Sequence, residues 1–303
     1  MAAPARDQGR GSSPALSKVD APSSNPARCR DETEQGLTRL QSGYWHDLTT
    51  TDFGRVDAER TVALLPVAAV EQHGPHLPLA TDAVINDGVV RAALERVPAG
   101  ATLLVLPAQN VGLSPEHAGF AGTLSVRDAT LLDVWTDLGR SVARAGVRKL
   151  IVFNTHGGQK TLVDLVAVRL RCELGMLVVR ATYFSFGTPP GLFDAAEAAH
   201  DIHGGEVETS LMLHLEPKLV RTAALADFRG LPHALAERGE VLGVEKPVGI
   251  GWRAEDLHPS GACGNAAKAD AQRGARHLAF LADRLAALVG EVAATPLAIL
   301  RQP

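Results

Sequence analysis

Carboxylate and imidazole side chains gather in one short segment of the sequence, from Glu71 to Asp82. Glu71 and His73 are two residues apart, so in an extended loop both side chains point to the same side. With Asp82 they offer the nitrogen and oxygen ligands that suit Zn²⁺, Mn²⁺ or Fe²⁺. We therefore expect this segment to supply half of a metal site. Two alternatives stand beside this hypothesis, namely Asp82 as the N-cap of a helix that starts at Ala83, and His76 as a hydrogen-bonding loop residue.

A second candidate is the segment from Asn154 to Gln159, which contains one histidine, His156, followed by two glycines. Gly157 and Gly158 allow a sharp turn and a close approach of the backbone to a ligand. Their amides, at the start of a following helix, are suited to bind an oxyanion of the substrate. A lone histidine is more often structural, but this one follows a predicted strand, as the first segment does. The shared sheet edge favours a common site.

The third candidate runs from Asp201 to Ser210 and contains a histidine and two glutamates. His203 is suited to general acid–base catalysis. Glu206 and Glu208 are two residues apart, which on a helix turns them by about 200° from one another. We therefore do not expect both to serve one site equally, and the pattern leaves open which of them does. The simpler interpretation is a helix start, where the helix dipole favours acidic residues.

A fourth segment, from Gly112 to Thr123, follows another predicted strand. Its glycines and polar groups fit a substrate-binding loop in which His117 contacts the substrate. The alternative is that Glu116 and His117 are plain surface residues, and the sequence gives the two interpretations equal weight.

Apolar runs and helical patterns alternate along the chain up to residue 183. The predicted strands are 62–67, 102–107, 149–154 and 176–183, and the predicted helices between them are 83–97, 126–145 and 160–174. Gly100, Gly146 and Gly175 stand at the expected helix ends. This alternation predicts an α/β fold with a mainly parallel sheet that helices cover on both faces. In open sheets of this class, ligands bind at the carboxyl ends of the strands, where candidate segments lie.

The remaining parts of the chain differ in character. Helical patterns recur at 204–215 and, rich in Ala and Leu, at 265–294, which we expect to pack on the sheet. No break in composition divides residues 44–303, so we expect one domain there. Residues 1–43 are rich in Ala, Ser, Pro and Gly without an apolar period, which predicts a disordered N-terminal extension.

Composition argues against several classes of partner. Hydrophobic residues make up 46% of the 303 residues, enough for a sizeable core, and the net charge of −4 gives no basis for binding nucleic acid or an anionic membrane. No apolar run reaches the roughly 18–20 residues that span a bilayer, and we find no apolar centre of a secretory signal. The three cysteines are scattered, which favours a reduced, cytoplasmic protein.

Taken together, the candidate segments resemble the creatininase (creatinine amidohydrolase) family. The resemblance lies in the motifs at 71–82, 154–158 and 203–210, which occur in the family's order, and in looser motifs at 122–125 and 260–264. It extends from about Trp45 to Leu288. It implies a three-layer α/β/α fold and a site for two divalent metal ions, Zn, Mn or Fe. Carried over residue by residue, the implied ligands are Glu71, His73, Asp82 and His156, with Asp82 as the bridge.

The chain also departs from the family's pattern. Creatininase has a glutamate ligand where this sequence has Gly158, so the resemblance implies that Glu208 supplies the missing carboxylate, with Glu206 as a rival for that place and a catalytic candidate. His203 matches a histidine at the creatininase substrate pocket. A tyrosine that encloses creatinine is replaced by Gly157, and a tryptophan near Ala199 is missing. We therefore do not expect creatinine itself to be the substrate.

The function that the resemblance implies is metal-dependent hydrolysis of a C–N amide bond in a cyclic or small amide, including formamides, by a hydroxide bound to the metals. His203 would pass protons to the leaving nitrogen, and Gly157 and Gly158 would bind the oxyanion. Two alternatives remain: a non-hydrolytic protein that binds metal or matures a modified peptide, and a hydrolase of a cyclic sugar ketone. Members of the family often form oligomers, with a hexamer in creatininase, so the resemblance implies a homo-oligomer. It also implies a small molecule as the substrate.

Overall fold

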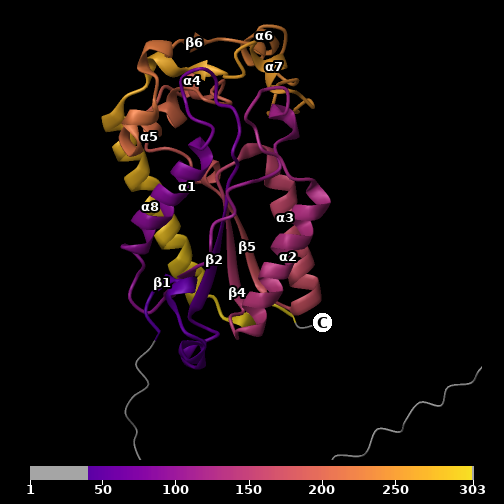
Figure 1. Cartoon of the computed structure of the whole chain (residues 1–303), viewed down its shortest axis with the longest axis vertical. Helices are drawn as coiled ribbons and strands as arrows, with labels where there is room; N and C mark the ends of the chain where they lie inside the picture. The colour runs from indigo at the N-terminus through magenta and orange to yellow at the C-terminus, as the bar shows by residue number, and fades with distance from the viewer. Residues whose placement is uncertain (1–39, 302–303) are drawn as a thin grey trace, which may run out of the picture. The chain divides into compact units, whose positions relative to one another are not determined.

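The structure of the chain is a computed structural model that describes residues 40–301. Within these residues, five parallel strands form the central sheet in the order β1-β3-β2-β4-β5 (Figure 1). Their bounds are Gly43–Tyr44 (β1), Thr61–Val67 (β2), Thr102–Val105 (β3), Lys149–Asn154 (β4) and Leu177–Thr182 (β5). The predicted parallel sheet is confirmed. The ends of β2 to β5 lie within two residues of the predicted ends, whereas β1 was not predicted.

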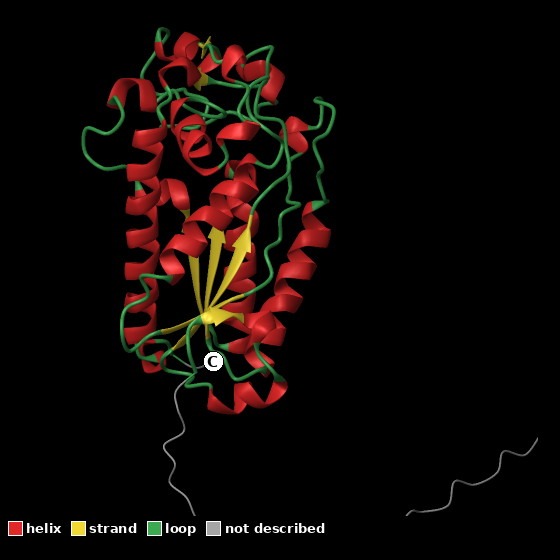
Figure 2. Ribbon diagram, turned by 60° about the vertical axis from the view of Figure 1, so that its left-hand side comes forward, coloured by secondary structure: helices red, strands yellow, loops and turns green. Residues whose placement is uncertain are grey.

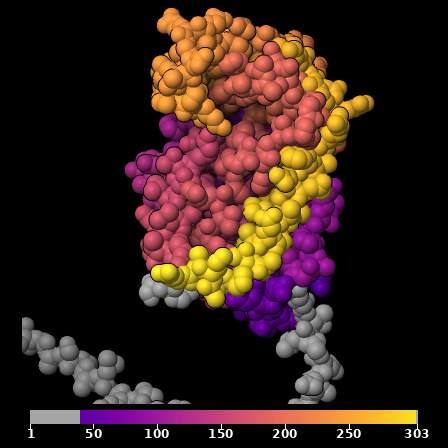
Figure 3. All heavy atoms as spheres, turned by 180° about the vertical axis from the view of Figure 1, so that it is seen from behind, coloured from indigo at the N-terminus to yellow at the C-terminus, as the bar shows by residue number. Residues whose placement is uncertain are grey.

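Helices cover both faces of the sheet, which gives the expected three layers (Figures 1 and 2). One face carries α1 (Thr81–Leu94), α5 (Glu206–Leu215) and α8 (Ala271–Ala294), and the other carries α2 (Asp128–Arg144) and α3 (Lys160–Leu174). Alternate residues of β2 enter different cores, because side chains alternate across a strand: Val62 and Leu64 pack with the first group of helices, and Ala63 and Leu65 with the second. In the view from behind, α8 forms an oblique band across the surface (Figure 3).

Short elements cover the end of the sheet to which the strands point (Figures 1 and 2). These are α4 (Ala195–Ala198), β6 (Asp227–Phe228), α6 (Leu231–Ala236), α7 (Ala254–Leu257) and β7 (Gly264–Asn265). β6 and β7 pair as a small antiparallel sheet. This cap encloses the carboxyl ends of the strands, where the sequence predicts the site.

Some predicted helix boundaries were wrong. The long C-terminal helix begins at Ala271 rather than at 265, because residues 264–265 pair with β6 and Asp270 caps the helix by accepting a hydrogen bond from the Arg273 amide at 2.8 Å. The first helix starts at Thr81 and ends at Leu94, ahead of Pro98, whose ring does not continue a helix. Residues 40–43, which precede the predicted domain start at residue 44, contact β3.

Two hydrogen bonds hold residues 40–43 against β3. The Thr102 hydroxyl donates to the carbonyl of Leu40, and the Leu103 amide donates to the hydroxyl of Ser42. The rest of the predicted extension, residues 1–39, lies outside the described residues.

The order in which the chain adds strands to the sheet reverses at β2. The chain passes from β2 to β3 on one side, and β4 then lies on the other side of β2. The loops that follow β2, β3 and β4 therefore diverge from one point and leave a crevice there, as doubly wound sheets do. None of the helices in residues 40–301 is long and apolar enough to cross a membrane.

Candidate metal centre

Five side chains from three candidate segments meet at the carboxyl ends of β2 and β4. Glu71 and His73 follow β2, Asp82 lies in the first turn of α1, His156 follows β4, and Glu208 lies in the first turn of α5. Each of the five residues is between 0% and 6% exposed. Burial to this degree distinguishes them from solvated surface charges, which need no partner, because a buried charge must be compensated. Three segments far apart in sequence therefore form one charged cluster in the interior.

Asp82 lies at the middle of the cluster, with its two carboxylate oxygens directed to different partners. Oδ1 is 3.3 Å from Nε2 of His73, and that nitrogen is 3.8 Å from Oε2 of Glu208. Oδ2 is 3.6 Å from Nδ1 of His156, and that nitrogen is 3.1 Å from Oε1 of Glu71. The side chain does not serve as an N-cap, since that position is Ala80. Asp82 thus joins two sets of three ligand atoms, each set within 4.8 Å.

The backbone fixes which nitrogen of each histidine faces the cluster. Nδ1 of His73 lies 3.0 Å from the carbonyl oxygen of Glu71, so it donates a proton there and leaves Nε2 directed at Asp82. Nε2 of His156 lies 2.9 Å from the carbonyl oxygen of Leu113, which leaves Nδ1 free to face Glu71. Metal-binding histidines are typically oriented in this way, with the second nitrogen donating to a backbone carbonyl.

Several polar atoms of the cluster are buried without a hydrogen bond. Within residues 40–301, Oε2 of Glu71, Nε2 of His73 and Oδ2 of Asp82 find no hydrogen-bond partner. A buried polar atom without a partner costs roughly 1–3 kcal/mol, and more when charged. These atoms converge from imidazole and carboxylate groups, the donor set of Zn²⁺, Mn²⁺ and Fe²⁺ sites. The residues present therefore fit the binding of divalent metal.

Close packing of these charges shifts their pKa values. Burial raises the pKa of Asp82 to about 6, against the attraction of His73. Burial also disfavours a charged His73, but the Asp82 carboxylate outweighs it and raises the pKa of His73 to about 9. Burial would raise the pKa of Glu71, yet the histidines around it, His156 first, hold that pKa below its usual value. Without a metal, His73 therefore keeps a second proton, whose charge balances the carboxylate of Asp82.

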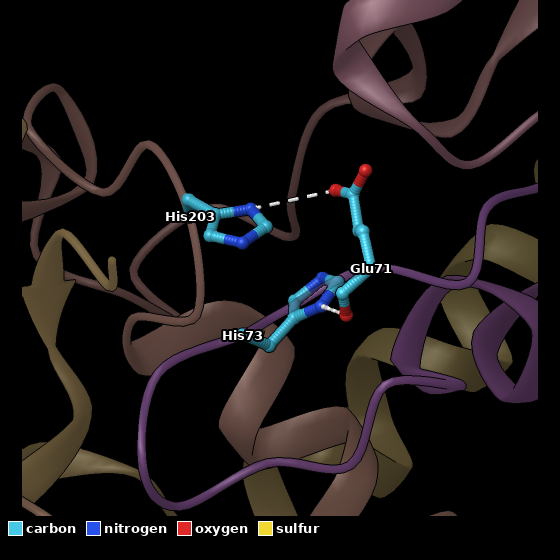
Figure 4. Close-up of side chains that lie close together, drawn as sticks. All are labelled: Glu71, His73 and His203. Carbon is cyan, nitrogen blue, oxygen red and sulfur yellow. Dashed lines mark hydrogen bonds and ion pairs between the residues drawn. The ribbon is translucent and has the colours of Figure 1, made fainter. Parts of the chain in front are cut away.

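His203 and His117 complete the wall of the site beside Glu71. Nε2 of His203 lies 2.5 Å from the carbonyl oxygen of Gln72 and so bears the proton, which leaves Nδ1 as an acceptor 3.9 Å from Oε1 of Glu71 (Figure 4). Burial is the largest cause that lowers the pKa of His203 to about 4, so the ring is neutral at pH 7.

The tautomer of His117 follows from Gln72. The Gln72 oxygen accepts from the amide of Gly74, so its Nε2 is the atom that donates to Nδ1 of His117 at 2.8 Å. Nε2 of His117 therefore bears the proton and lies 3.3 Å from Oε1 of Glu71. Burial, followed by the charge of His203, lowers the pKa of His117 to about 2. His117 is a neutral donor that is 1% exposed, which excludes the surface interpretation.

The structure does not bring Glu206 to the cluster. Its carboxylate pairs with the guanidinium of Arg273 on α8, whereas Glu208 faces His73 and accepts a hydrogen bond from the Gly204 amide at 2.7 Å. The helical turn of about 200° between the two glutamates explains the difference. His76 forms a hydrogen bond, as the alternative interpretation expected, since its Nε2 lies 3.0 Å from the hydroxyl oxygen of Thr209.

One acidic residue was not among the predicted site residues. Glu116, in a short 3₁₀ helix (Pro115–His117), has Oε1 3.4 Å from Nε2 of His156. The available signal was its position next to His117, in a loop that follows a strand of the same sheet edge. That signal alone does not decide whether Glu116 lies on the surface or in the site.

A cavity of about 1100 Å³ opens onto the cluster. Gly157 and Gly158 line it near the charged groups, so the structure brings both predicted glycines to the site. Farther out, the lining includes the apolar side chains Phe184, Ile250 and Trp252. The volume slightly exceeds the range of about 300–1000 Å³ that is typical of small-molecule sites.

The sequence model of a family described as creatininase, creatinine amidohydrolase, matches residues 46–289. The mycofactocin precursor peptide peptidase of Mycobacterium ulcerans is 33% identical over 215 residues, which are 67% of this chain and 79% of that protein. The creatinine amidohydrolase of Pseudomonas putida is 34% identical over 198 residues, which are 60% of this chain and 75% of that protein.

Solved structures are similar over most of the chain. One described as "Creatininase Mn" has a TM-score of 0.66 at 26% identity and covers 83% of this chain and 98% of that chain. A creatininase variant described as "Zn-Zn type" has a TM-score of 0.68 at 26% identity with the same coverage. The fold thus has counterparts in proteins whose descriptions name Mn and Zn.

Proposed function

The chain belongs to the creatininase family of metal-dependent hydrolases, and from this premise we propose that it hydrolyses a C–N amide bond with two divalent metal ions. The observation that carries the proposal is the position of Asp82, whose two oxygens face separate sets of ligand atoms. Glu71, Asp82 and His156 would hold one ion, and His73, Asp82 and Glu208 the other. When bound, such ions polarise a carbonyl and lower the pKa of a coordinated water to about 7.

The other residues of the site supply proton transfer and orientation. His203 presents an unprotonated Nδ1 beside Glu71, where it can accept a proton and pass it to the leaving nitrogen. His117 holds its proton on Nε2, pointing into the same space, and can donate to the substrate oxygen. The amides of Gly157 and Gly158 precede α3 and are suited to the negative charge that develops on that oxygen.

A small or cyclic amide other than creatinine is the substrate class that we propose first. A creatinine site is expected to have an aromatic residue directly after the histidine that corresponds to His156. This chain has Gly157 there, and the missing side chain leaves the inner cavity open. A peptide amide is the second candidate. Two observations favour it: the cavity of about 1100 Å³ exceeds what a small cyclic amide needs, and a relative at 33% identity is described as a peptide peptidase.

We also propose that the protein is a cytoplasmic homo-oligomer. The free thiols of Cys172 and Cys263 support this location. Support for an oligomer is the family resemblance, and light scattering after size-exclusion chromatography would test it.

The experiment that tests the proposed activity is a substrate screen of the metal-loaded protein. Cyclic amides, formamides and short peptides are each incubated with the wild type and with Asp82→Asn, and release of the amine is measured. We expect one class to be cleaved by the wild type only. Cleavage of none of them by protein with full metal content, or equal cleavage by Asp82→Asn, would overturn the proposal.

A further inference from the structure

The space beside Gly158 is already filled by another residue. A Cβ atom placed on Gly158 would lie 1.7 Å from Oε1 of Glu116, 2.8 Å from its Cδ and 2.7 Å from Nε2 of His156. For Gly157, by contrast, a Cβ would meet no atom of the described chain within 4 Å. A side chain at 158 and the Glu116 carboxylate in this position therefore exclude each other. Gly158 is required here as a residue without a side chain, rather than for backbone freedom.

The Glu116 carboxylate lies inside the site, and its ion-pair contact is His156, which also contacts Leu113 and Glu71. Its side chain is 12% exposed, and Oε1 is buried with no hydrogen-bond partner among the described residues. The nearest imidazole nitrogen, Nε2 of His156 at 3.4 Å, already donates to the carbonyl of Leu113. A buried carboxylate oxygen left in this state is unfavourable unless a cation or a donor balances it.

Other ligand atoms converge on the same space. Glu116, Glu71 and His117 form a group whose ligand atoms lie within 4.8 Å of one another. Because His117 keeps its proton on Nε2, it balances neither carboxylate with a full charge. Glu71 also belongs to the set formed with Asp82 and His156. Glu116 thus lies next to Glu71 and beside Nε2 of His156, the ring nitrogen that does not face Asp82.

We propose that Glu116 is an additional carboxylate ligand of the ion held by Glu71, Asp82 and His156, and that it takes the place that a side chain at position 158 would occupy. The inference rests on the proposed function, because it requires a divalent ion in the cluster. It accounts for two facts at once, namely the missing side chain at Gly158 and the unpartnered oxygen of Glu116. The carboxylate is then supplied from the loop after β3 instead of the loop after β4.

Exchanging the two positions tests this inference by metal binding alone. Mn²⁺ is titrated into the metal-free full chain, and its affinity and stoichiometry are measured by calorimetry. The variants are Glu116→Gln, Gly158→Glu, and the double variant Glu116→Gly with Gly158→Glu. Glu240→Gln serves as the matched control, because Glu240 is an exposed carboxylate that lines the same cavity. Circular dichroism verifies that each variant is folded.

We expect Glu116→Gln to weaken one of the two Mn²⁺ sites by about tenfold or more, the range seen when a carboxylate that supports a metal site is removed. Gly158→Glu should weaken the same site, since two carboxylates then compete for one space. The double variant should regain most of the lost affinity, and Glu240→Gln should match the wild type.

Two results would overturn the inference. One is unchanged Mn²⁺ affinity in Glu116→Gln. The other is a double variant that binds no better than Glu116→Gln, because the carboxylate would then not be interchangeable between the two positions. Failure of the wild type to bind Mn²⁺ is a different outcome, since it contradicts the proposed function itself.

Discussion

Asp82 is the residue on which both halves of the site depend. Oδ1 faces His73 and Oδ2 faces His156, at 3.3 Å and 3.6 Å, so its removal affects both sets of ligand atoms. Asparagine keeps the shape of the side chain and removes the negative charge. We expect Asp82→Asn to lower both metal affinity and kcat/KM by about a hundredfold or more, because a shared ligand contributes to each ion.

Elemental analysis and steady-state kinetics of the purified variant would check this expectation. Glu206→Gln is the comparison, because it removes a buried carboxylate from the adjacent helix without touching the cluster. Full metal content and full activity in Asp82→Asn would contradict the assignment.

Metal binding should depend on pH through His73. With its pKa raised to about 9 by Asp82 in spite of burial, His73 is protonated at neutral pH in the metal-free protein. A cation can bind its Nε2 only after that nitrogen has lost its proton. Affinity for Mn²⁺ therefore rises with pH and levels off above the pKa of His73, and each binding event releases protons.

Calorimetry in buffers of different ionisation enthalpy, from about pH 6 to about pH 8, would count the released protons. Constant affinity over this range without proton release would show that His73 is not a ligand.

At the scale of elements, the pairing of Glu206 with Arg273 joins α5 to α8. The Glu206 side chain is 6% exposed and that of Arg273 is 28% exposed. Because the pair is largely shielded from water, Glu206→Gln should reduce the free energy of unfolding by about 1–3 kcal/mol. The metal affinity should be retained, because Glu208 on the same helix keeps its place. Urea denaturation with and without Mn²⁺ would measure both effects, and loss of metal without loss of stability would reverse the roles of the two glutamates.

The close approach of α8 to α5 depends on Gly274. A Cβ there would lie 1.9 Å from the carbonyl oxygen of Ser210, and a backbone atom cannot move aside as a flexible side chain does. Gly274→Ala should therefore destabilise the protein by about 1–3 kcal/mol through overpacking, despite the higher helix propensity of alanine. Gln272→Ala, at an exposed position of the same helix, is the matched control. A raised melting temperature in Gly274→Ala would contradict this packing.

Elements with local signals could be predicted closely from the sequence. The bounds of β4 and α3 are those expected, because an apolar run ends at Asn154 and Gly175 stops the helix in a left-handed conformation with φ of 66°. Predictions failed where the deciding contact is distant in sequence. β7 pairs with β6 across more than thirty residues, so the periodicity of the 265–294 pattern alone placed the start of α8 too early.

At the scale of the whole molecule, the parallel sheet explains why the site could be foreseen in part. Segments that follow neighbouring parallel strands end at the same edge, so a pattern of apolar runs was sufficient to bring Glu71 and His156 together. The choice between Glu206 and Glu208 depends on how α5 is rotated against α8, which no local pattern specifies. Glu116 enters the site because Gly158 leaves space for it, and this relation exists only in three dimensions.

The metal content of the whole chain, purified without added metal, tests the central claim most directly. Elemental analysis should find about two ions of Zn, Mn or Fe per chain in the wild type, because the ligand atoms form two sets around Asp82. Asp82→Asn, analysed in parallel, should contain far less. A wild-type protein that binds no divalent metal, even after reconstitution, would contradict the claim that this cluster is a metal centre.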